Sequence, residues 1–179
     1  MSFLDLVRKR QSVRKYAKRS VPREVIDRCI EAARLAPSAC NAQPWSFVIV
    51  DKEPALKTIV DGAFSGVYSL NAFAKDAPVM IAVVTERSGY MARLGGYFRG
   101  VQFSLVDIGI ACEHLILQAA EEGLGTCWLG WFDEKKVKEI VKIPREKKID
   151  ILISLGYPED PGPREKQRRP LEEIRRYTA

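Results

Sequence analysis

The N-terminal part of this 179-residue chain places Arg10, Ser12 and Arg14 at alternate positions. In an extended segment, residues two apart share one face, so two guanidinium groups and a hydroxyl could converge on one anion. The alternative is a solvated basic loop, since the motif is weak when taken alone. The spacing therefore indicates an anion site, provided that the segment is extended.

A second candidate lies between Pro37 and Pro44, where the chain carries the short polar side chains Ser38, Asn41 and Gln43. Each proline disfavours helix at the residue before it, so we expect an irregular loop that joins a helix to a strand. The polar side chains could face a ligand, or they could only satisfy the backbone of a connector. Both interpretations stay open at this point.

A third candidate is the glycine-punctuated stretch from Gly123 to Asp133. Gly125 and Gly130 permit close approach of the backbone, so N–H groups near Gly130 and Trp131 could face a flat ligand. The alternative is a helix cap followed by an ordinary core strand. The stretch is not a dinucleotide fingerprint, because Gly-x-Gly-x-x-Gly does not open a helix after a strand here.

Charge and composition limit the classes of function. The formal charge is +6, with basic clusters at 8–19 and 164–169 that suit nucleic acid, an anionic surface or one phosphate group of a small molecule. Neither cluster has the regular aromatic residues of a single-strand binding surface. His114 is the only histidine, and the four cysteines have no zinc-like spacing. We therefore expect neither a metal site nor a histidine-based triad.

Length and hydropathy predict the organisation of the chain. With 46% hydrophobic residues, it fits one domain over 1–179, in which 157–179 is an extended, charged and Pro-rich tail lying over the body or a second subunit. The N-terminus does not resemble a signal peptide, and polar residues such as Asp107 interrupt the apolar stretch around 105–120. We expect a cytoplasmic protein without a membrane span.

Periodicity and breaker residues predict helices that alternate with strands. Helices are expected at Phe3–Val7, from Pro22 to Ala33, from Pro54 to a stop at Gly62, at 103–122 and after the N-cap Asp133. Strands are expected at Ser46–Val50, Val79–Val84, Thr126–Trp131 and Ile149–Leu155. The stretch from Phe64 to Ala74 should be a helix or loop with exposed aromatic side chains. The pattern predicts an α/β or α+β sheet flanked by helices, with the strand order open.

Five motifs together resemble the FMN-dependent nitroreductase superfamily. They are Arg10-x-Ser-x-Arg-x-Tyr16, Ala36-Pro-Ser-Ala-x-Asn-x-Gln-Pro-Trp45, Ala77-Pro-Val79, Gly123-Leu-Gly-Thr-Cys-Trp128 and Lys166-x-Arg-Arg-Pro-Leu-Glu-Glu173. The resemblance spans essentially the whole chain. It implies an α+β fold with a central, mostly antiparallel sheet flanked by helices, in an interlocked homodimer that holds FMN at two interface sites.

The resemblance also implies roles for particular residues. The flavin carries the chemistry, so no catalytic side chain is expected, although Arg14 would stabilise negative charge at the N1/O2 edge of the reduced flavin. The residues expected to surround the FMN phosphate are Arg10, Ser12, Lys166 and Arg168, with Gln11 beside them. The expected contacts to the flavin ring are Leu129, Gly130 and Trp131, with Asn71 as a looser candidate for the pyrimidine edge. The residues expected from the other subunit are Pro37, Ser38, Ala39 and Asn41.

The implied reaction has two steps: NAD(P)H passes hydride to flavin N5, and a nitroaromatic, quinone or free flavin then takes two electrons. Trp131 stands where many relatives carry Gly or Ala, so its indole could narrow the substrate cavity. Deiodinase-like, flavin-fragmenting or ferredoxin-coupled activities are alternatives within the superfamily. An alternative from a different class is a basic module that binds nucleic acid.

Overall fold

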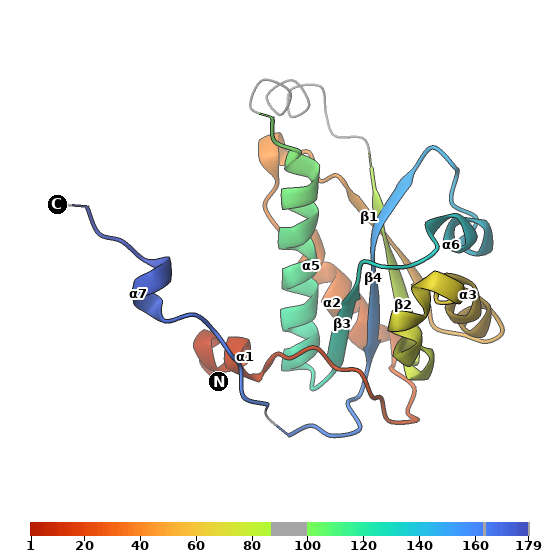
Figure 1. Cartoon of the computed structure of the whole chain (residues 1–179), viewed down its shortest axis with the longest axis horizontal. Helices are drawn as coiled ribbons and strands as arrows, with labels where there is room; N and C mark the ends of the chain where they lie inside the picture. Colours follow the sequence, from red (N-terminus) through yellow and green to blue (C-terminus); the bar gives the residue numbers. More distant parts are fainter. Residues whose placement is uncertain (87–99, 163, 179) are drawn as a thin grey trace.

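The computed structural model describes residues 1–86, 100–162 and 164–178, and its centre is a four-stranded sheet (Figure 1). The strands are β1 (Trp45–Val50), β2 (Val79–Thr85), β3 (Gly125–Leu129) and β4 (Lys148–Gly156). They lie in the order β1-β2-β4-β3, and every neighbouring pair is antiparallel. This confirms the α+β fold class and the antiparallel sheet.

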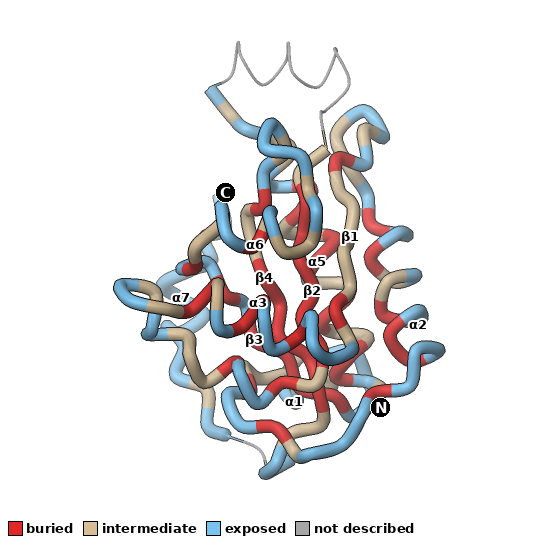
Figure 2. Tube along the Cα trace, turned by 90° about the vertical axis from the view of Figure 1, so that its right-hand side faces the viewer, coloured by how far each residue is buried: buried red, intermediate tan, exposed pale blue. Residues whose placement is uncertain are grey.

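Helices cover both faces of the sheet. Figure 1 shows α2 (Arg23–Arg34) and α5 (Phe103–Glu121) on one side, and α3 (Ala55–Ala63) and α6 (Glu134–Val141) on the other. Consecutive residues of β2 alternate between the two hydrophobic clusters, so this strand is buried on both faces, as predicted (Figure 2). The sheet is therefore a rigid layer between two cores.

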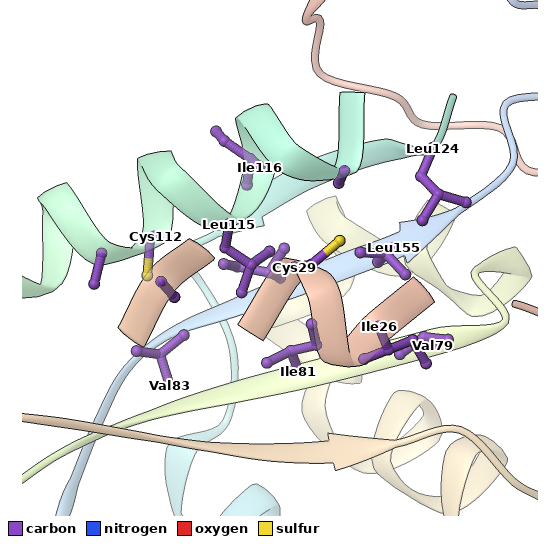
Figure 3. Packing of buried hydrophobic residues seen from close by; sticks show 14 of the residues in the cluster. Ile26, Cys29, Val79, Ile81, Val83, Cys112, Leu115, Ile116, Leu124 and Leu155 are labelled. Atoms are coloured by element: carbon purple, nitrogen blue, oxygen red, sulfur yellow. The ribbon is translucent and has the colours of Figure 1, made fainter. Parts of the chain in front are cut away.

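Two cysteines belong to the core between α2, α5 and the sheet. Cys29 of α2 and Cys112 of α5 pack among Ile26, Leu115 and Ile81 (Figure 3). Burial raises the pKa of both thiols to about 12, so they are inert apolar side chains at neutral pH.

The long helix α5 is a core helix in this structure. By length and composition alone it passes as a membrane span, a test that core helices of soluble proteins also pass. The side chains on its buried side include Ala111, Cys112 and Leu115, which pack in the same hydrophobic cluster as side chains of α2 and β2. Leu105 and Val106, near its start, are exposed.

Two predictions around α3 were wrong. Gly62 does not stop the helix, which continues to Ala63. The glycine instead allows α6 to pack closely against α3, because an added Cβ would lie 2.9 Å from Ile140 Cδ1. Phe64 is 5% exposed rather than a surface aromatic, because it packs into the cluster between α3, α6 and the sheet. Tyr68 and Phe73 are half-buried rather than exposed.

The remaining elements are short. They are α1 (Phe3–Lys9), the 3-10 helices η1 (Ala39–Asn41) and η2 (Gly66–Asp76), and α7 (Leu171–Ile174). Strand β3 ends two residues before the predicted end, so Gly130 and Trp131 lie in the connection to α6. The tail passes α1 and then leaves the body, with α7 exposed (Figure 1).

Candidate functional site

The N-terminal segment lies beside the edge strand β3. Ser12 forms a parallel bridge with Thr126, and the Val13 N–H donates to the Thr126 carbonyl oxygen at 2.9 Å. Gly125 makes this contact possible, because a Cβ there would lie only 2.4 Å from Val13 Cγ2. Val13 is buried and Arg14 is exposed. The close approach predicted for Gly125 therefore exists, but it admits Val13 rather than a ligand.

Tyr16 fixes the end of the same segment. Its hydroxyl donates to the Val13 carbonyl oxygen at 3.0 Å and shares a 2.8 Å hydrogen bond with Ser154 Oγ of β4. Tyr16 is 5% exposed, and this burial raises its pKa far above the usual value. The phenol is therefore neutral and acts as a bridge between the segment and the sheet.

Positive charges gather where the tail crosses the N-terminal segment. Gln11 Nε2 donates to the Gly162 carbonyl oxygen at 3.0 Å, and Lys166 Nζ donates to the Val7 carbonyl oxygen. The pKa of Lys166 is lowered, first by burial and then by the charges of Arg10 and Arg168. Within the described residues, none of these three cations forms an ion pair. The cluster therefore favours a multiply charged anion.

A second group of candidates meets at η2. Asn71 Nδ2 donates to the Trp131 carbonyl oxygen at 2.9 Å, and Trp131 Nε1 donates to the Val67 carbonyl oxygen at 2.9 Å. The indole also packs on Tyr68, with 5.3 Å between the ring centres, yet remains 54% exposed. The Arg14 guanidinium lies 5.7 Å from the centre of the Phe73 ring, on the same 3-10 helix. The Trp131 indole is thus an exposed aromatic ring whose position is set by its hydrogen bond to Val67 and its packing on Tyr68.

The Leu129 side chain belongs to the core. The whole residue is 0% exposed, so neither its side chain nor its backbone is open to a ligand in this chain. The next residue, Gly130, has open space for contact, because an added Cβ would meet only Ile151 Cδ1, at 3.9 Å.

The loop after Pro37 has an irregular backbone, as predicted. Three of its non-glycine residues, Cys40, Asn41 and Gln43, have left-handed φ angles of 45° to 53°. Ser38 Oγ accepts the Gln43 N–H at 3.0 Å, and Gln43 Nε2 donates to Asn41 Oδ1 at 3.0 Å. These polar side chains therefore support the loop itself, which was one of the two interpretations left open.

One chain does not bring all candidate residues together. Ala39 contacts Asp107 in the first part of α5, whereas Arg10 lines a cavity of about 150 Å³ with Ile116 and Ala120 near the other end. Thirteen residues of helix separate Asp107 from Ala120, a rise of about 20 Å. Figure 1 shows η1 and α1 at opposite ends of α5. The loop and the cation cluster are therefore two separate groups of candidate residues in one chain.

Sequence reasoning missed two residues that support these two groups. Asp107 accepts a hydrogen bond from the Ala39 N–H of the loop, and Ser154 in β4 shares a hydrogen bond with the Tyr16 hydroxyl. Asp107 had a visible signal, since it is a carboxyl group in the mainly apolar first half of α5. Ser154 had none, because a lone serine in a strand has many ordinary uses. Within the described residues, no three His, Cys, Asp or Glu side chains gather as a metal site would require.

The family model described as "Nitroreductase family" matches residues 7–157 of this chain. The chain belongs to the nitroreductase family. It is 33% identical over 170 residues to a protein of Methanothermobacter thermautotrophicus that is provisionally named an NADH dehydrogenase/NAD(P)H nitroreductase, covering 92% of this chain and 82% of that protein. It is 27% identical to the iodotyrosine deiodinase of Thermotoga neapolitana, covering 89% and 90%.

The fold agrees with solved members of the family. An FMN-dependent nitroreductase of Clostridium difficile R20291 superposes with a TM-score of 0.71 and 27% identity, covering 96% of this chain and 94% of that chain. The family resemblance inferred from the five motifs is therefore confirmed.

Proposed function

We propose that this protein is an FMN-dependent oxidoreductase that uses NAD(P)H to reduce a small acceptor such as a nitroaromatic, a quinone or a flavin. The observation that carries the proposal is the cluster of Arg10, Lys166 and Arg168, in which no member forms an ion pair within the described residues; burial and then the charges of the two arginines lower the pKa of Lys166. A phosphate monoester brings a charge of nearly −2 and several acceptor oxygens, which match such a cluster. The names of the relatives support FMN and NAD(P)H as its ligands.

The residues present would divide the work of holding FMN. Arg10, Ser12, Lys166 and Arg168 would bind the phosphate, with Gln11 tying the segment to the tail. Arg14 would face the N1/O2 edge, where negative charge collects on reduction. The backbone of Gly130 and Trp131 would line the O4/N5 side, next to the buried Leu129, and Asn71 would hold that backbone through the Trp131 carbonyl. When bound, FMN supplies hydride transfer from NAD(P)H to the acceptor.

We infer that the site is completed in a homodimer. The loop and the cation cluster would be its two half-sites, and they lie at opposite ends of α5, so Pro37, Ser38, Ala39 and Asn41 would serve the cofactor of the partner subunit. Large apolar side chains are exposed on α1, at the start of α5 and in the tail, where a second copy could cover them, namely Phe3, Leu4, Leu105, Val106, Leu171, Ile174 and Tyr177. Exposed apolar area of this kind marks an interaction surface. A soluble dimer of this type would act in the cytoplasm.

The first test is the cofactor. The purified protein should be yellow, carry one FMN per subunit and bleach when NAD(P)H is added without oxygen. The double variant Arg10→Ala/Arg168→Ala should lose FMN and keep the fold. Arg23→Ala/Arg34→Ala is the matched control, because it removes the same charge from exposed arginines that pair with carboxylates on α2 and after β1. Colourless protein that FMN cannot reconstitute would contradict the proposal.

The same preparation separates the alternatives. A nucleic-acid module would bind DNA with steep salt dependence and without flavin. The deiodinase relative makes iodotyrosine an acceptor to test beside a nitroaromatic and a quinone. Faster reduction of the nitroaromatic and the quinone than of iodotyrosine would support the function proposed here.

A further inference from the structure

Asp107 is a buried carboxyl group in an apolar helix. Asp107 is 3% exposed, and its neighbours on the buried side of α5 include Ile108 and Ala111. Oδ1 accepts the Ala39 N–H at 3.0 Å, and Oδ2 has no hydrogen-bond partner within the described residues. A carboxyl group with one unpaired oxygen in such a place opposes folding, because its lost hydration is only partly replaced.

The contact of Asp107 lies on the loop that carries the partner-facing residues. Within the parts of the chain that the structure describes, the other hydrogen bonds of residues 38–43 stay inside the loop or its immediate flank. The bond from Ala39 to Asp107 is the one that ties these residues to another element. The loop must also hold Cys40 and Asn41 at left-handed φ angles, a conformation that residues with side chains seldom adopt.

We propose that Asp107 is a positioning residue for the flavin loop, and that through Ala39 it supports FMN bound at the partner's half-site. This inference rests on the proposed function. Asp107 does not touch the cofactor. Its carboxyl oxygen holds the Ala39 amide against α5, and this anchor limits the conformations that Ser38, Ala39 and Asn41 can take. The unfavourable free energy of burying the carboxyl group is offset in the FMN complex, because an ordered loop loses less conformational entropy when it binds FMN.

Two substitutions at this position separate positioning from simple stability. Asp107→Asn keeps a carbonyl oxygen for the Ala39 N–H, so FMN affinity should stay within about twofold of wild type. Asp107→Leu keeps the branching at Cγ but has no acceptor, so the FMN dissociation constant should rise roughly tenfold. The melting temperature of FMN-free Asp107→Leu should stay close to that of wild type, because the lost bond to Ala39 is offset by removal of the unpaired Oδ2 from the core.

Hydrogen exchange in FMN-free protein provides a readout that does not depend on the cofactor. Backbone amides of residues 38–43 should exchange faster in Asp107→Leu than in wild type, and Asp107→Asn should restore the protection. Ala39→Pro removes the donor from the loop side, and Ser38, at φ −146° and ψ 155°, already has the backbone that precedes proline. The double variant Asp107→Leu/Ala39→Pro should bind FMN no more weakly than the weaker single variant, because both changes remove one bond.

The outcomes distinguish this inference from the proposed function. Failure of the wild-type protein to bind FMN would refute the proposed function, and with it any role of Asp107 in flavin binding. If wild type binds FMN and Asp107→Leu binds it equally tightly with unchanged exchange, the inference alone is overturned. Additive losses in the double variant would also overturn it. Should Asp107→Leu fail to fold, Asp107→Ala replaces it: weaker FMN binding in Asp107→Ala, with no further loss in Asp107→Ala/Ala39→Pro relative to the weaker single variant, supports the inference, and wild-type affinity in Asp107→Ala contradicts it.

Discussion

Gly125→Ala would test how the N-terminal segment is held against β3. An added Cβ would lie 2.4 Å from Val13 Cγ2 and 2.7 Å from Val13 Cβ, well inside the contact distance of two carbon atoms. Val13 is 4% exposed and its N–H is bonded to Thr126, so it has little room to retreat. The segment that carries Ser12 and Arg14 must therefore move away from the sheet.

The expected magnitude follows from the packing. Forcing one extra methyl group into a well-packed core costs about 1–3 kcal/mol. In a domain of this size, that cost lowers the melting temperature by roughly 2–12 °C. Displacing the segment should also break a charge-assisted bond to the FMN phosphate, which raises the dissociation constant of FMN roughly tenfold. Thermal unfolding of FMN-free protein and titration with FMN measure the two effects separately.

Controls isolate the steric cause. Gly130→Ala makes the same chemical change just after the other end of β3, where the new Cβ would lie an ordinary 3.9 Å from Ile151 Cδ1, so the melting temperature should not change. Adding Val13→Ala to Gly125→Ala removes two of the three close carbons and should recover part of the lost stability. A Gly125→Ala protein with wild-type melting temperature and FMN affinity would refute the reasoning.

Three further predictions concern the same site. Tyr16→Phe should lower the free energy of unfolding by about 1–3 kcal/mol in urea, because buried Ser154 loses its 2.8 Å partner; an unchanged value would mean that the bond adds nothing. FMN affinity should fall as the pH rises through the pKa of Lys166, which lies below 10.5 before phosphate binds, because a bound dianion favours the protonated amine. Lys166→Arg should remove this fall, and a fall that persists in this variant would have another origin. Trp131→Gly should raise kcat/KM for bulky acceptors more than for small ones, and an equal response would make the indole purely structural.

Much of the fold could be predicted because its signals are local. The unbroken apolar run of β2 predicted a strand buried on both faces, and the structure confirms it. The errors at Gly62 and Phe64 arose where tertiary packing overrides a local rule. Gly62 reads as a helix stop, but it is needed inside α3 for close contact with Ile140 of α6, a residue far along the chain. No local pattern carries that information.

The candidate site could be predicted as motifs but not as an arrangement. The sequence indicated an anion site at Arg10 to Arg14, yet it could not indicate that Gly125 receives Val13 or that Asn71 bonds the Trp131 carbonyl. These contacts join segments more than fifty residues apart, and their partners are fixed by the order of strands, which stayed open. The positions of the motifs were therefore clearer from sequence than the contacts that hold them.

The cation cluster joins the two ends of the chain, and this has an energetic consequence. Arg10 comes from the N-terminal segment, and Lys166 and Arg168 come from the tail, which is tied down at Gln11 and Val7. Burial of Lys166 and repulsion from Arg10 and Arg168 both oppose this association, and both lower the pKa of Lys166. A bound phosphate would turn that repulsion into attraction and so stabilise the docked tail. Because the apolar side chains of the tail would lie on a second copy, we expect cofactor binding, tail docking and dimer formation to stabilise one another.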